Sequence, residues 1–485
     1  MSTRTMTENG MQTINTSHYI GGEFVKGTLE PVDIIDKYDR KILGTINAID
    51  DHQLETAIAN AAKARTMMSK LSSEHRYQQL MKLADLIAQD RTHFADLIVA
   101  EAGKPIESAK GEVSRSIATV QLAAQAALQM CGPSVNIDMQ AGLGMACHTI
   151  RKPKGVVLAL APYNFPLNLA LHKLGPALAA GCPIILKPSH HAPLSCFHLA
   201  TLLQTLDFPP GAITVMHCSN DQSERLIQDE RVKVVSFTGS DQVGWHLKTL
   251  APTKTVVLEL GGNSAAIVGQ YSDIDNAAKQ LSRGAFLYAG QICISTQRVI
   301  VVESQRQALQ AALIETMKSI QVGNPKDSDV MVGPMISQQA FEKTQALVNE
   351  AIDKGARVVF QAGRLDVERH LYPATLLENV DSKLSIYRDE AFAPILILES
   401  ANDFFHAVER ANDSRYGLQA GVFTDRIDEM RFAHQNLAVG GVIINHPPGF
   451  RVDSMPYGGV KSSGVGREGP RFAIEDMTDL CTLIV

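Results

Sequence analysis

Strands and helices alternate along the middle of this chain, and this alternation restricts the possible folds more than any other feature. Residues 156–160 form a continuous apolar run, a helix is predicted over 166–181, and 184–186 form the next strand. The pattern repeats with a strand at 232–237 and a helix at 242–250. Continuously apolar strands joined by helices indicate a parallel sheet that is covered on both faces. We therefore predict an α/β fold with a doubly wound sheet, which binds a nucleotide at the carboxyl ends of its strands.

Four other segments complete the expected organisation. The Ala-rich stretch 51–132 has helical periodicity and is predicted to form layered helices. Residues 136–152 are predicted to form a hairpin that leaves the main body, and 409–445 a second α/β unit. The apolar segment 480–485 is predicted to be a strand that pairs with a partner subunit's sheet, because an exposed apolar edge would aggregate.

Length and charge narrow the possible functions. A chain of 485 residues is expected to form about two to four domains, because single cores stop growing near ~250–300 residues. Its 45% apolar and 20% charged residues are typical of a globular protein. The net charge of −6 gives no general attraction to nucleic acid or to an anionic membrane. The longest apolar stretches, such as 155–162, are too short to span a bilayer.

The N-terminus and the cysteines indicate a cellular context. Residues 1–17 are polar, without an apolar core, and are predicted to be a flexible leader rather than a signal peptide. Seven scattered cysteines without CxxC spacing argue against a disulfide framework or a metal site and favour a reducing cytoplasm. Six of them are interpreted as buried packing residues: Cys131, Cys147, Cys182, Cys196, Cys218 and Cys481.

The seventh cysteine lies in a context that favours catalysis. Cys293 ends the sequence GQIC, and Glu259 stands between the apolar strand 256–258 and a Gly-Gly turn. A thiolate adds covalently to a carbonyl carbon, and a neighbouring carboxylate can take the thiol proton and later activate a water. We therefore interpret Cys293 as a candidate nucleophile and Glu259 as a candidate general base.

Two polar residues at strand ends are further candidates, and each has a structural alternative. Asn164 stands in a strand-to-helix turn, where its amide can stabilise an oxyanion or can simply cap the helix. Lys187 follows the strand at 184–186. Its ammonium group can reach ribose hydroxyls or a phosphate there, or it can be an ordinary surface lysine.

A short turn after the strand at 232–237 has the composition of a phosphate cradle. The turn Thr238-Gly239-Ser240 supplies backbone N–H groups and hydroxyls, and Gly244 opens the helix that follows. No predicted strand is followed directly by the G-x-G-x-x-G sequence of ordinary dinucleotide-binding folds. The turn by itself therefore indicates a nucleotide site without identifying its family.

Eight motifs, taken in their order and spacing, resemble the aldehyde dehydrogenase superfamily. The resemblance covers the chain from about His18 to the C-terminus. The motifs are APYNFP at 161–166, ILKPS at 185–189, FTGS at 237–240, LELGGN at 258–263, GQIC at 290–293, EAFAP at 390–394, YGLQAGVFT at 416–424 and MPYGGVKSSGVGREG at 455–469.

The resemblance implies a role for each matching residue. Cys293 would be the nucleophile that forms a thiohemiacetal, and Glu259 the base that activates the hydrolytic water. Asn164 and the Cys293 backbone N–H would form the oxyanion hole. The residues implied to contact an NAD or NADP cofactor are Lys187 and Glu390 at the ribose hydroxyls, Ser240 at the pyrophosphate and Phe392 beside the nicotinamide, together with Tyr163, Ser189, His190, Gly239 and Gly244.

The resemblance also implies an aldehyde dehydrogenase-like fold of two doubly wound α/β domains and a small β oligomerisation arm. The cofactor-binding domain is expected at residues 1–129 and 151–260, and the catalytic domain at 261–462. The arm is expected at 130–150 and 463–485. It implies a homodimer or a homotetramer.

Two residues depart from the family pattern near the cofactor. His190 stands where family members that prefer NAD carry a glutamate that binds the adenosine ribose. Without that carboxylate its repulsion of a 2′-phosphate is absent, so NADP is expected to be accepted beside NAD. Tyr163 stands where a tryptophan is common, which is a mild change.

The expected function is NAD(P)-dependent oxidation of a small aldehyde to its carboxylic acid, with a C-terminal motif like that of members acting on lactaldehyde or semialdehydes. Arg115 and Arg451 are predicted to face the aldehyde tunnel or, alternatively, to form structural ion pairs. One alternative function is transfer of the acyl group to coenzyme A, against which Glu259 argues. Another is a catalytically silent protein with this fold, against which Cys293, Glu259 and Asn164 argue.

Overall fold

The first sheet is built from the strands whose continuous apolar runs stand out in the sequence. The computed structural model describes residues 15–485, so positions 1–14 of the predicted leader lie outside the described residues. The parallel strands follow the order β8-β7-β6-β9-β10. They are β6 (Val156–Leu160), β7 (Ile184–Lys187), β8 (Ile213–Val215), β9 (Val232–Thr238) and β10 (Thr255–Glu259). Antiparallel strands extend both edges: β1 (His18–Ile20) and β2 (Glu23–Val25) beyond β8, and β22 (Gly464–Val465) beside β10.

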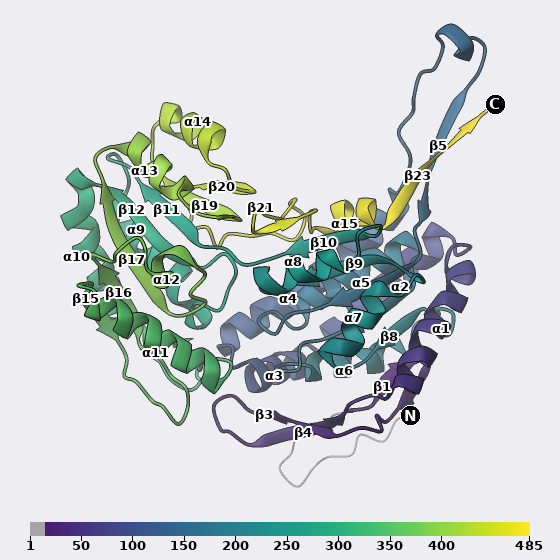
Figure 1. Ribbon diagram of the computed structural model, residues 1–485, viewed down its shortest axis with the longest axis horizontal. Coiled ribbons are helices and arrows are strands. Elements are labelled where there is room, and N and C mark those ends of the chain that lie inside the picture. The colour runs from purple at the N-terminus through teal and green to yellow at the C-terminus, as the bar shows by residue number, and fades with distance from the viewer. Residues whose placement is uncertain (1–14) are drawn as a thin grey trace.

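Helices cover both faces of this sheet, as the alternation predicts (Figure 1). The N-terminal block is helical, and its last helix ends at Leu128, four positions before Gly132, with Gln129 as its C-cap. The helices of this unit are α1 (Asp51–Met68), α2 (Ser73–Gln89), α3 (Arg91–Ala102), α4 (Ile106–Leu128), α5 (Asn168–Ala180), α6 (Leu194–Leu203), α7 (Asn220–Gln228) and α8 (Asp241–Thr249). The doubly wound arrangement is therefore confirmed.

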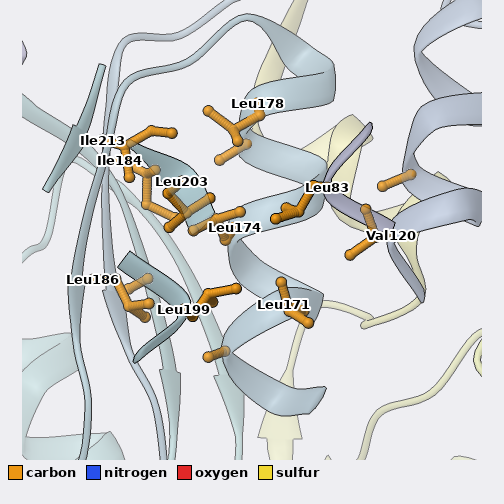
Figure 2. Close-up of a cluster of buried hydrophobic side chains, with 14 of the residues drawn as sticks. Leu83, Val120, Leu171, Leu174, Leu178, Ile184, Leu186, Leu199, Leu203 and Ile213 are labelled. Carbon is orange, nitrogen blue, oxygen red and sulfur yellow. The ribbon is translucent and has the colours of Figure 1, made fainter. Parts of the chain in front are cut away.

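The core of the first unit lies where α5 is sandwiched between the sheet and other helices (Figure 2). Leu174 and Leu178 of α5 are fully buried against apolar residues of β7 and α6 on one side. Leu83 of α2 and Val120 of α4 close the other side. An apolar helix with neighbours on both sides fixes the strand ends that carry the candidate site residues.

We expect Leu174→Ala to lower the free energy of unfolding of this unit by about 3 kcal/mol, because it removes buried methyl groups and leaves a cavity. Urea unfolding followed by far-UV circular dichroism measures the shift of the transition. The matched control is Leu365→Ala, at a side chain that is 44% exposed, with an expected change within about 0.5 kcal/mol. Equal shifts for both variants would contradict this account of the core.

The second α/β unit contains a sheet in the order β15-β16-β17-β12-β11-β19-β20, in which β15 alone runs antiparallel to its neighbour. Its strands are β11 (Ser264–Val268), β12 (Thr296–Val302), β15 (Arg357–Ala362), β16 (Ala374–Glu378), β17 (Ile395–Ala401), β19 (Gln419–Phe423) and β20 (Gly441–Ile444). Its helices are α9 (Ile274–Phe286), α10 (Arg306–Met317), α11 (Gln338–Asp353), α12 (Ser385–Arg388), α13 (Phe404–Asn412) and α14 (Ile427–Asn436). The predicted second unit over 409–445 corresponds to its last strands and helices.

Short elements complete the chain. They are β3 (Pro31–Ile35) with β4 (Ile42–Asn47), β13 (Gln321–Val322) with β14 (Val330–Val332), and β18 (Tyr416–Gly417) with β21 (Val460–Lys461). Among residues 15–485, none of the helices combines the length and the apolar character that a membrane span requires.

A thin two-stranded arm projects from the first unit (Figure 1). The hairpin predicted over 136–152 is wrong, because β5 (Cys147–Pro153) pairs with β23 (Thr478–Ile484) rather than with a neighbouring segment. The pairing is antiparallel along seven residues of each strand, and residues 136–146 contain only the short 3-10 helix Gln140–Gly142. The C-terminal strand thus finds its first partner within its own chain.

The predicted extent of the arm, 463–485, needs a second correction. Strand β22 joins the first sheet, and α15 (Pro470–Asp476) packs against α5 and α4. These positions belong to the body, since their apolar side chains Ala473 and Ile474 are buried there. Within 463–485, the arm is therefore formed by β23.

The burial predicted for six cysteines is correct for three. Cys182, Cys196 and Cys218 are buried in the first unit, whereas Cys131 is exposed and Cys147 and Cys481 are half-buried. Cys147 and Cys481 lie on the two-stranded arm, which has no core to receive them. All seven cysteines lie in the described part of the chain, and none forms a disulfide.

Candidate active site

A cavity of about 550 Å³ lies at the carboxyl ends of β6, β7, β9 and β10. Such an edge is the usual ligand site of an open α/β sheet. The predicted residues that line it are Tyr163, Asn164, Lys187, Ser189, His190, Gly239, Ser240, Glu259, Cys293, Glu390 and Phe392. Among the predicted catalytic and cofactor residues, Gly244 is the exception: it is buried in α8, where a Cβ atom would collide with Leu260. Its role is to let α8 pack closely on the turn after Glu259.

A strained turn presents Cys293 to this cavity. Tyr288, Ala289 and Gly290 have φ angles of 55°, 54° and 66°, so three consecutive residues adopt the left-handed region. Non-glycine residues in that region cost about 1–3 kcal/mol each and persist where the surroundings hold them. The side chain of Gln291 supplies such support, because its amide accepts from the Ile336 N–H at 2.9 Å and donates to the Pro334 carbonyl at 3.2 Å.

The thiol of Cys293 makes a hydrogen bond with the hydroxyl of Tyr457, with Sγ and Oη 2.9 Å apart. Burial raises the pKa of the Cys293 thiol to about 11, while the Tyr457 hydrogen bond and the Arg451 charge act in the opposite direction. Tyr457 belongs to the sequence motif at 455–469, but the sequence alone implies no role for its hydroxyl. The hydrogen bond depends on contacts between distant segments, which no local pattern reveals.

The carboxylate of Glu259 is held at the end of β10 without a partner. Pairing of Glu259 with Gly464 of β22 fixes its backbone, and the residue is 3% exposed. Neither carboxylate oxygen accepts a hydrogen bond from any described residue. Burial and the charge of Glu468 raise the pKa of Glu259 well above its usual value, against the opposing charges of Arg451 and Lys173. A buried carboxylate of this kind is suited to accept a proton.

The side chain of Asn164 contacts the loop that carries the thiol. Its Nδ2 donates to the Gln291 carbonyl at 3.0 Å, and the residue is buried. The capping alternative is wrong, because Oε1 of Glu112 accepts the N–H groups of Leu167 and Asn168 at 3.0 and 3.1 Å where α5 begins. An amide has a second N–H to offer, so the predicted oxyanion role stays open to Asn164.

The other end of the cavity has the features of a dinucleotide cradle. Ser240 caps α8 by accepting the Val243 N–H, and the helix N-terminus faces the cavity with its partial positive charge. Lys187 ends β7 with its ammonium group beside the same space, where burial lowers its pKa. A Cβ atom at Gly239 would collide with the ring of Phe237, so glycine keeps this turn close.

Glu390 and Phe392 approach from the second unit. Glu390 accepts the Gly262 N–H at 3.2 Å, and burial raises its pKa to about 7. A Cβ atom at Gly261 would clash with the Glu390 carboxylate, so the glycine turn is what admits that carboxylate. Together with Lys187 and the N-terminus of α8, these residues fit a nicotinamide dinucleotide, with hydroxyl-binding groups at one end and a phosphate cradle at the other.

Histidines occupy the region next to Lys187. The rings of His190 and His191 lie 3.9 Å apart between centroids. Burial, followed by the charges of Lys187 and Lys37, lowers the pKa of His190, so its ring is neutral at neutral pH. Another residue that lines this cavity, Glu224, is paired with His246 at 3.1 Å.

Comparison with known proteins identifies the family of this chain. A model of the aldehyde dehydrogenase family matches residues 24–483. A 3-sulfolactaldehyde dehydrogenase from Priestia megaterium is 36% identical over 463 residues, which cover 95% of this chain and 96% of that protein. A lactaldehyde dehydrogenase from Methanococcus maripaludis is 36% identical over 472 residues, which cover 96% of this chain and 99% of the relative. The chain belongs to the aldehyde dehydrogenase family.

Solved structures agree with this assignment. Aldehyde dehydrogenase 21 from Physcomitrella patens, in complex with the reaction product succinate, has a TM-score of 0.94 and 34% identity, covering 97% of this chain and 98% of that chain. A glyceraldehyde-3-phosphate dehydrogenase from Methanocaldococcus jannaschii, complexed with NADP, has a TM-score of 0.89 and 35% identity, with 95% and 99% coverage. The predicted fold class, the enzyme class and the NAD(P) cofactor are therefore confirmed. Within residues 15–485, no group of three or more His, Cys, Asp or Glu side chains is arranged to hold a metal ion.

The enzyme has a second cavity, of about 390 Å³, and its lining residue Arg451 lies over the ring of Tyr457. It is lined by Arg115 and Arg451, together with one face of α4. Arg115 binds Asp453 with two hydrogen bonds, of 2.7 and 3.0 Å, and Arg451 binds Glu468 at 3.1 Å. The ion-pair alternative is therefore confirmed for both arginines, and both also line a cavity.

A buried ion pair beside Glu259 escaped the sequence analysis. Lys173 of α5 donates to Glu468 at 3.1 Å and to Thr238 at 2.7 Å. Although burial raises it, the pKa of Glu468 is held at about 2 by Lys173 and Arg451. The one available signal was a lysine next to His172 in the otherwise apolar helix α5, which is fully buried. A charged residue in a buried helix requires a partner, and here the partner lies 295 positions further along the chain.

We expect Glu468→Gln to move the acid limb of the kcat–pH profile to lower pH. A general base acts in its ionised form, so with Glu259 as the base activity would rise with pH as Glu259 loses its proton. The negative charge of Glu468 raises the Glu259 pKa. Removing that charge lowers the pKa, so the base is active at lower pH. Steady-state rates across the pH range measure the limb, which should disappear in Glu259→Gln. Glu475→Gln, at an exposed position of α15, is the matched control, and an upward shift or no shift in Glu468→Gln would contradict the argument.

Proposed function

We propose that this enzyme oxidises a small anionic aldehyde to its carboxylic acid, with Cys293 as nucleophile and Glu259 as general base. The observation that carries the proposal is that the thiol and an unpartnered buried carboxylate line one cavity, whose far end fits a dinucleotide. The remaining cofactor residues are proposed as the sequence motifs imply, with Gly244 acting through packing.

The first step forms a covalent bond between the enzyme and the aldehyde. Glu259, directly or through a water, takes the Cys293 proton, and the thiolate attacks the carbonyl carbon to give a thiohemiacetal anion. The second N–H of the Asn164 amide and the Cys293 backbone N–H donate to the developing oxyanion. Such preorganised donors stabilise charge that appears only in the transition state.

The second step collapses this anion to a thioester. A nicotinamide dinucleotide held by Lys187, Glu390 and the N-terminus of α8 would supply the acceptor for the hydride that leaves the former aldehyde carbon. Phe392 and Tyr163 line the cavity from opposite units, with ring centroids 6.1 Å apart, and exclude water from this region. Glu390, through its contact with the Gly262 N–H, orients the ribose end.

The last step hydrolyses the thioester. Glu259 first releases the Cys293 proton to solvent. It then takes a proton from a water that attacks the acyl carbon, the C–S bond breaks, and the acid leaves the thiolate of Cys293 behind. A free carboxylate next to the thiol favours water as the acyl acceptor over coenzyme A. The coenzyme A alternative predicts instead an acyl thioester product and a rate that depends on added coenzyme A.

The second cavity supports an anionic substrate. Arg451 reaches from this cavity to the ring of Tyr457, beside the thiol, and its buried Nε has no hydrogen-bond partner among the described residues. Arg115 lies over the ring of Phe165, the neighbour of Asn164, at 5.7 Å. An aldehyde entering here would meet two guanidinium groups, which bind carboxylate, sulfonate or phosphate groups well. The relatives named for 3-sulfolactaldehyde and the neighbour holding succinate agree with this class.

Assembly and location are further parts of the proposal. The arm of β5 and β23 carries exposed apolar side chains, among them Ile150, Leu480 and Leu483, which support its use in a homodimer or homotetramer. The absence of disulfides among its seven cysteines supports a reducing, cytoplasmic compartment. The domain limits 1–129, 151–260 and 261–462 remain proposals, with the arm shortened as described above.

We expect Cys293→Ala to abolish aldehyde oxidation, because the thiol is the covalent catalyst. Formation of reduced nicotinamide, followed by its absorbance with and without coenzyme A, is the assay. Cofactor binding, measured by fluorescence quenching, should stay close to wild type. Cys131→Ala, at an exposed cysteine, is the matched control with full activity. A residual kcat of more than about a hundredth of wild type in Cys293→Ala would refute the nucleophile.

We expect NADP to be accepted with a KM within about tenfold of that for NAD, or about 1.4 kcal/mol, because His190 is neutral and places no negative charge beside a 2′-phosphate. His190→Glu should raise the KM for NADP selectively, and His190→Gln, which adds no charge, is the matched control. Initial rates with both cofactors measure the effect. If His190→Glu weakens both cofactors equally, His190 does not face the 2′ position.

We expect Arg115→Ala to raise the KM for succinate semialdehyde by about tenfold, the strength of one charge-assisted pair, and to leave propanal nearly unchanged. Arg115 is chosen because, unlike Arg451, it does not contact a neighbour of the thiol. Arg115→Lys keeps the charge and should retain part of the preference. Steady-state kinetics with both aldehydes give the ratio that decides. Equal losses for the charged and the neutral aldehyde would mean that Arg115 serves only its ion pair with Asp453.

A further inference from the structure

The Tyr457 hydroxyl touches the reacting sulfur atom, and the reaction described above gives it no task. The two atoms lie 2.9 Å apart, within hydrogen-bonding distance. An uncharged hydroxyl can accept a hydrogen bond from a thiol or, after rotation, donate one to a thiolate. The question is whether the surroundings favour one of these two arrangements.

The ring of Tyr457 is fixed in place. It is 3% exposed and packs with Ile294 and Leu418, next to Cys293 itself. Its backbone N–H donates to the Glu468 carbonyl at 3.0 Å, and the Glu468 N–H donates to the Tyr457 carbonyl at 2.6 Å. A side chain held from both the ring and the backbone presents its hydroxyl in one direction.

A cation lies directly on the ring of Tyr457. The guanidinium carbon of Arg451 is 3.7 Å from the ring centroid. Glu468 accepts a hydrogen bond from Arg451 at 3.1 Å, and the guanidinium also lies 3.4 Å from Nε2 of His172. A positive charge on the face of a phenol stabilises electron density that shifts toward its oxygen, so the hydroxyl becomes a stronger donor.

We propose that Tyr457 is a catalytic residue that donates a hydrogen bond to the Cys293 thiolate, and that Arg451 is a positioning residue that strengthens this donor from the ring face. In the resting thiol the S–H bond points to the Tyr457 oxygen. When Glu259 accepts the thiol proton, the hydroxyl rotates and donates a hydrogen bond to the sulfur while it keeps its own proton. This inference rests on the proposed role of Cys293 as nucleophile.

The charges around the sulfur explain why such a donor is needed. Burial disfavours the thiolate, and the carboxylates of Glu390 and Glu259 act in the same direction on the pKa of Cys293. Tyr457 and Arg451 are the groups that oppose them. Burial also raises the pKa of Tyr457 well above its usual value, so its hydroxyl stays protonated and able to donate.

Alkylation of Cys293 by iodoacetamide as a function of pH tests the inference without any aldehyde. Modification is followed by mass spectrometry of the peptide that contains Cys293, because exposed cysteines such as Cys131 also react. In Tyr457→Phe we expect alkylation to be about tenfold slower at neutral pH and its pH midpoint to rise by about one, as expected for the loss of one hydrogen bond to a charged group.

Tyr387→Phe is the matched control. Tyr387 is also buried, its hydroxyl also makes a hydrogen bond, to Glu399 at 2.9 Å, and Arg298 lies over its ring at 4.9 Å. It has no contact with Cys293, so its loss should leave the alkylation midpoint unchanged. Arg451→Gln should shift the midpoint in the same direction as Tyr457→Phe, and Arg451→Lys, which keeps the cation, should restore part of it.

The outcomes separate this inference from the proposed function. A midpoint in Tyr457→Phe that equals the wild-type value, or moves no more than in Tyr387→Phe, overturns the inference even if Cys293→Ala is inactive. A fall in rate at every pH without a change in midpoint also overturns it, because that is the effect of a purely structural role. If Arg451→Gln fails to fold, Tyr457→Phe still decides. Activity retained in Cys293→Ala would instead remove the proposed function, whatever the alkylation result.

Discussion

The antiparallel pairing of β22 with the end of β10 is the interaction on which the active site depends. It aligns Glu259 with Gly464, and the Leu260 N–H donates to the Ser463 carbonyl at 3.0 Å. Backbone hydrogen bonds of this kind fix the register of the two segments relative to each other. Tyr457 shortly precedes β22 in the chain and Glu468 shortly follows it, so this pairing places both next to residues of the first unit. A site that uses side chains from both α/β units is thus assembled around one short strand pair.

Two cations and two carboxylates lie together in this site, and one of the carboxylates, Glu259, has no hydrogen-bond partner among the described residues. Lys173 and Arg451 each bind Glu468, and that carboxylate keeps its charge. Glu259 lies close enough to feel these charges, yet accepts no hydrogen bond from a described residue. Burial of an ion costs several kcal/mol unless it is paired, so the surroundings favour the protonated form of Glu259 and make its ionised form a strong proton acceptor. The ion pair therefore acts on the base through its charges, and that of Glu468 raises the pKa of Glu259.

The sequence predicted those features that depend on neighbouring residues. The doubly wound sheet and the positions of Cys293, Glu259 and Asn164 follow from strand-turn-helix patterns that are complete within a few residues. Features that depend on distant segments were missed or wrong. The arm strand β5 pairs with β23, more than 300 positions further along the chain, and the helix start for which Asn164 was one candidate cap is capped by Glu112 from another helix. The packing role of Gly244 and the contact between Tyr457 and the thiol likewise require three-dimensional contacts that no local pattern contains.

The position of β22 also has a consequence for the newly made chain. The other strands of the first sheet emerge from the ribosome long before residues 464–465. During synthesis, therefore, one edge of β10, the strand that carries Glu259, is unpaired. An unpaired edge is a template for association with other chains. Until the last residues emerge, Glu259 has no Lys173–Glu468 pair beside it, and the thiol of Cys293 has neither Tyr457 nor Arg451 near it. During synthesis the nucleophile therefore lacks its neighbours Tyr457 and Arg451 at the same time as the sheet edge is unpaired. The late pairing of β22 with β10 ends both conditions.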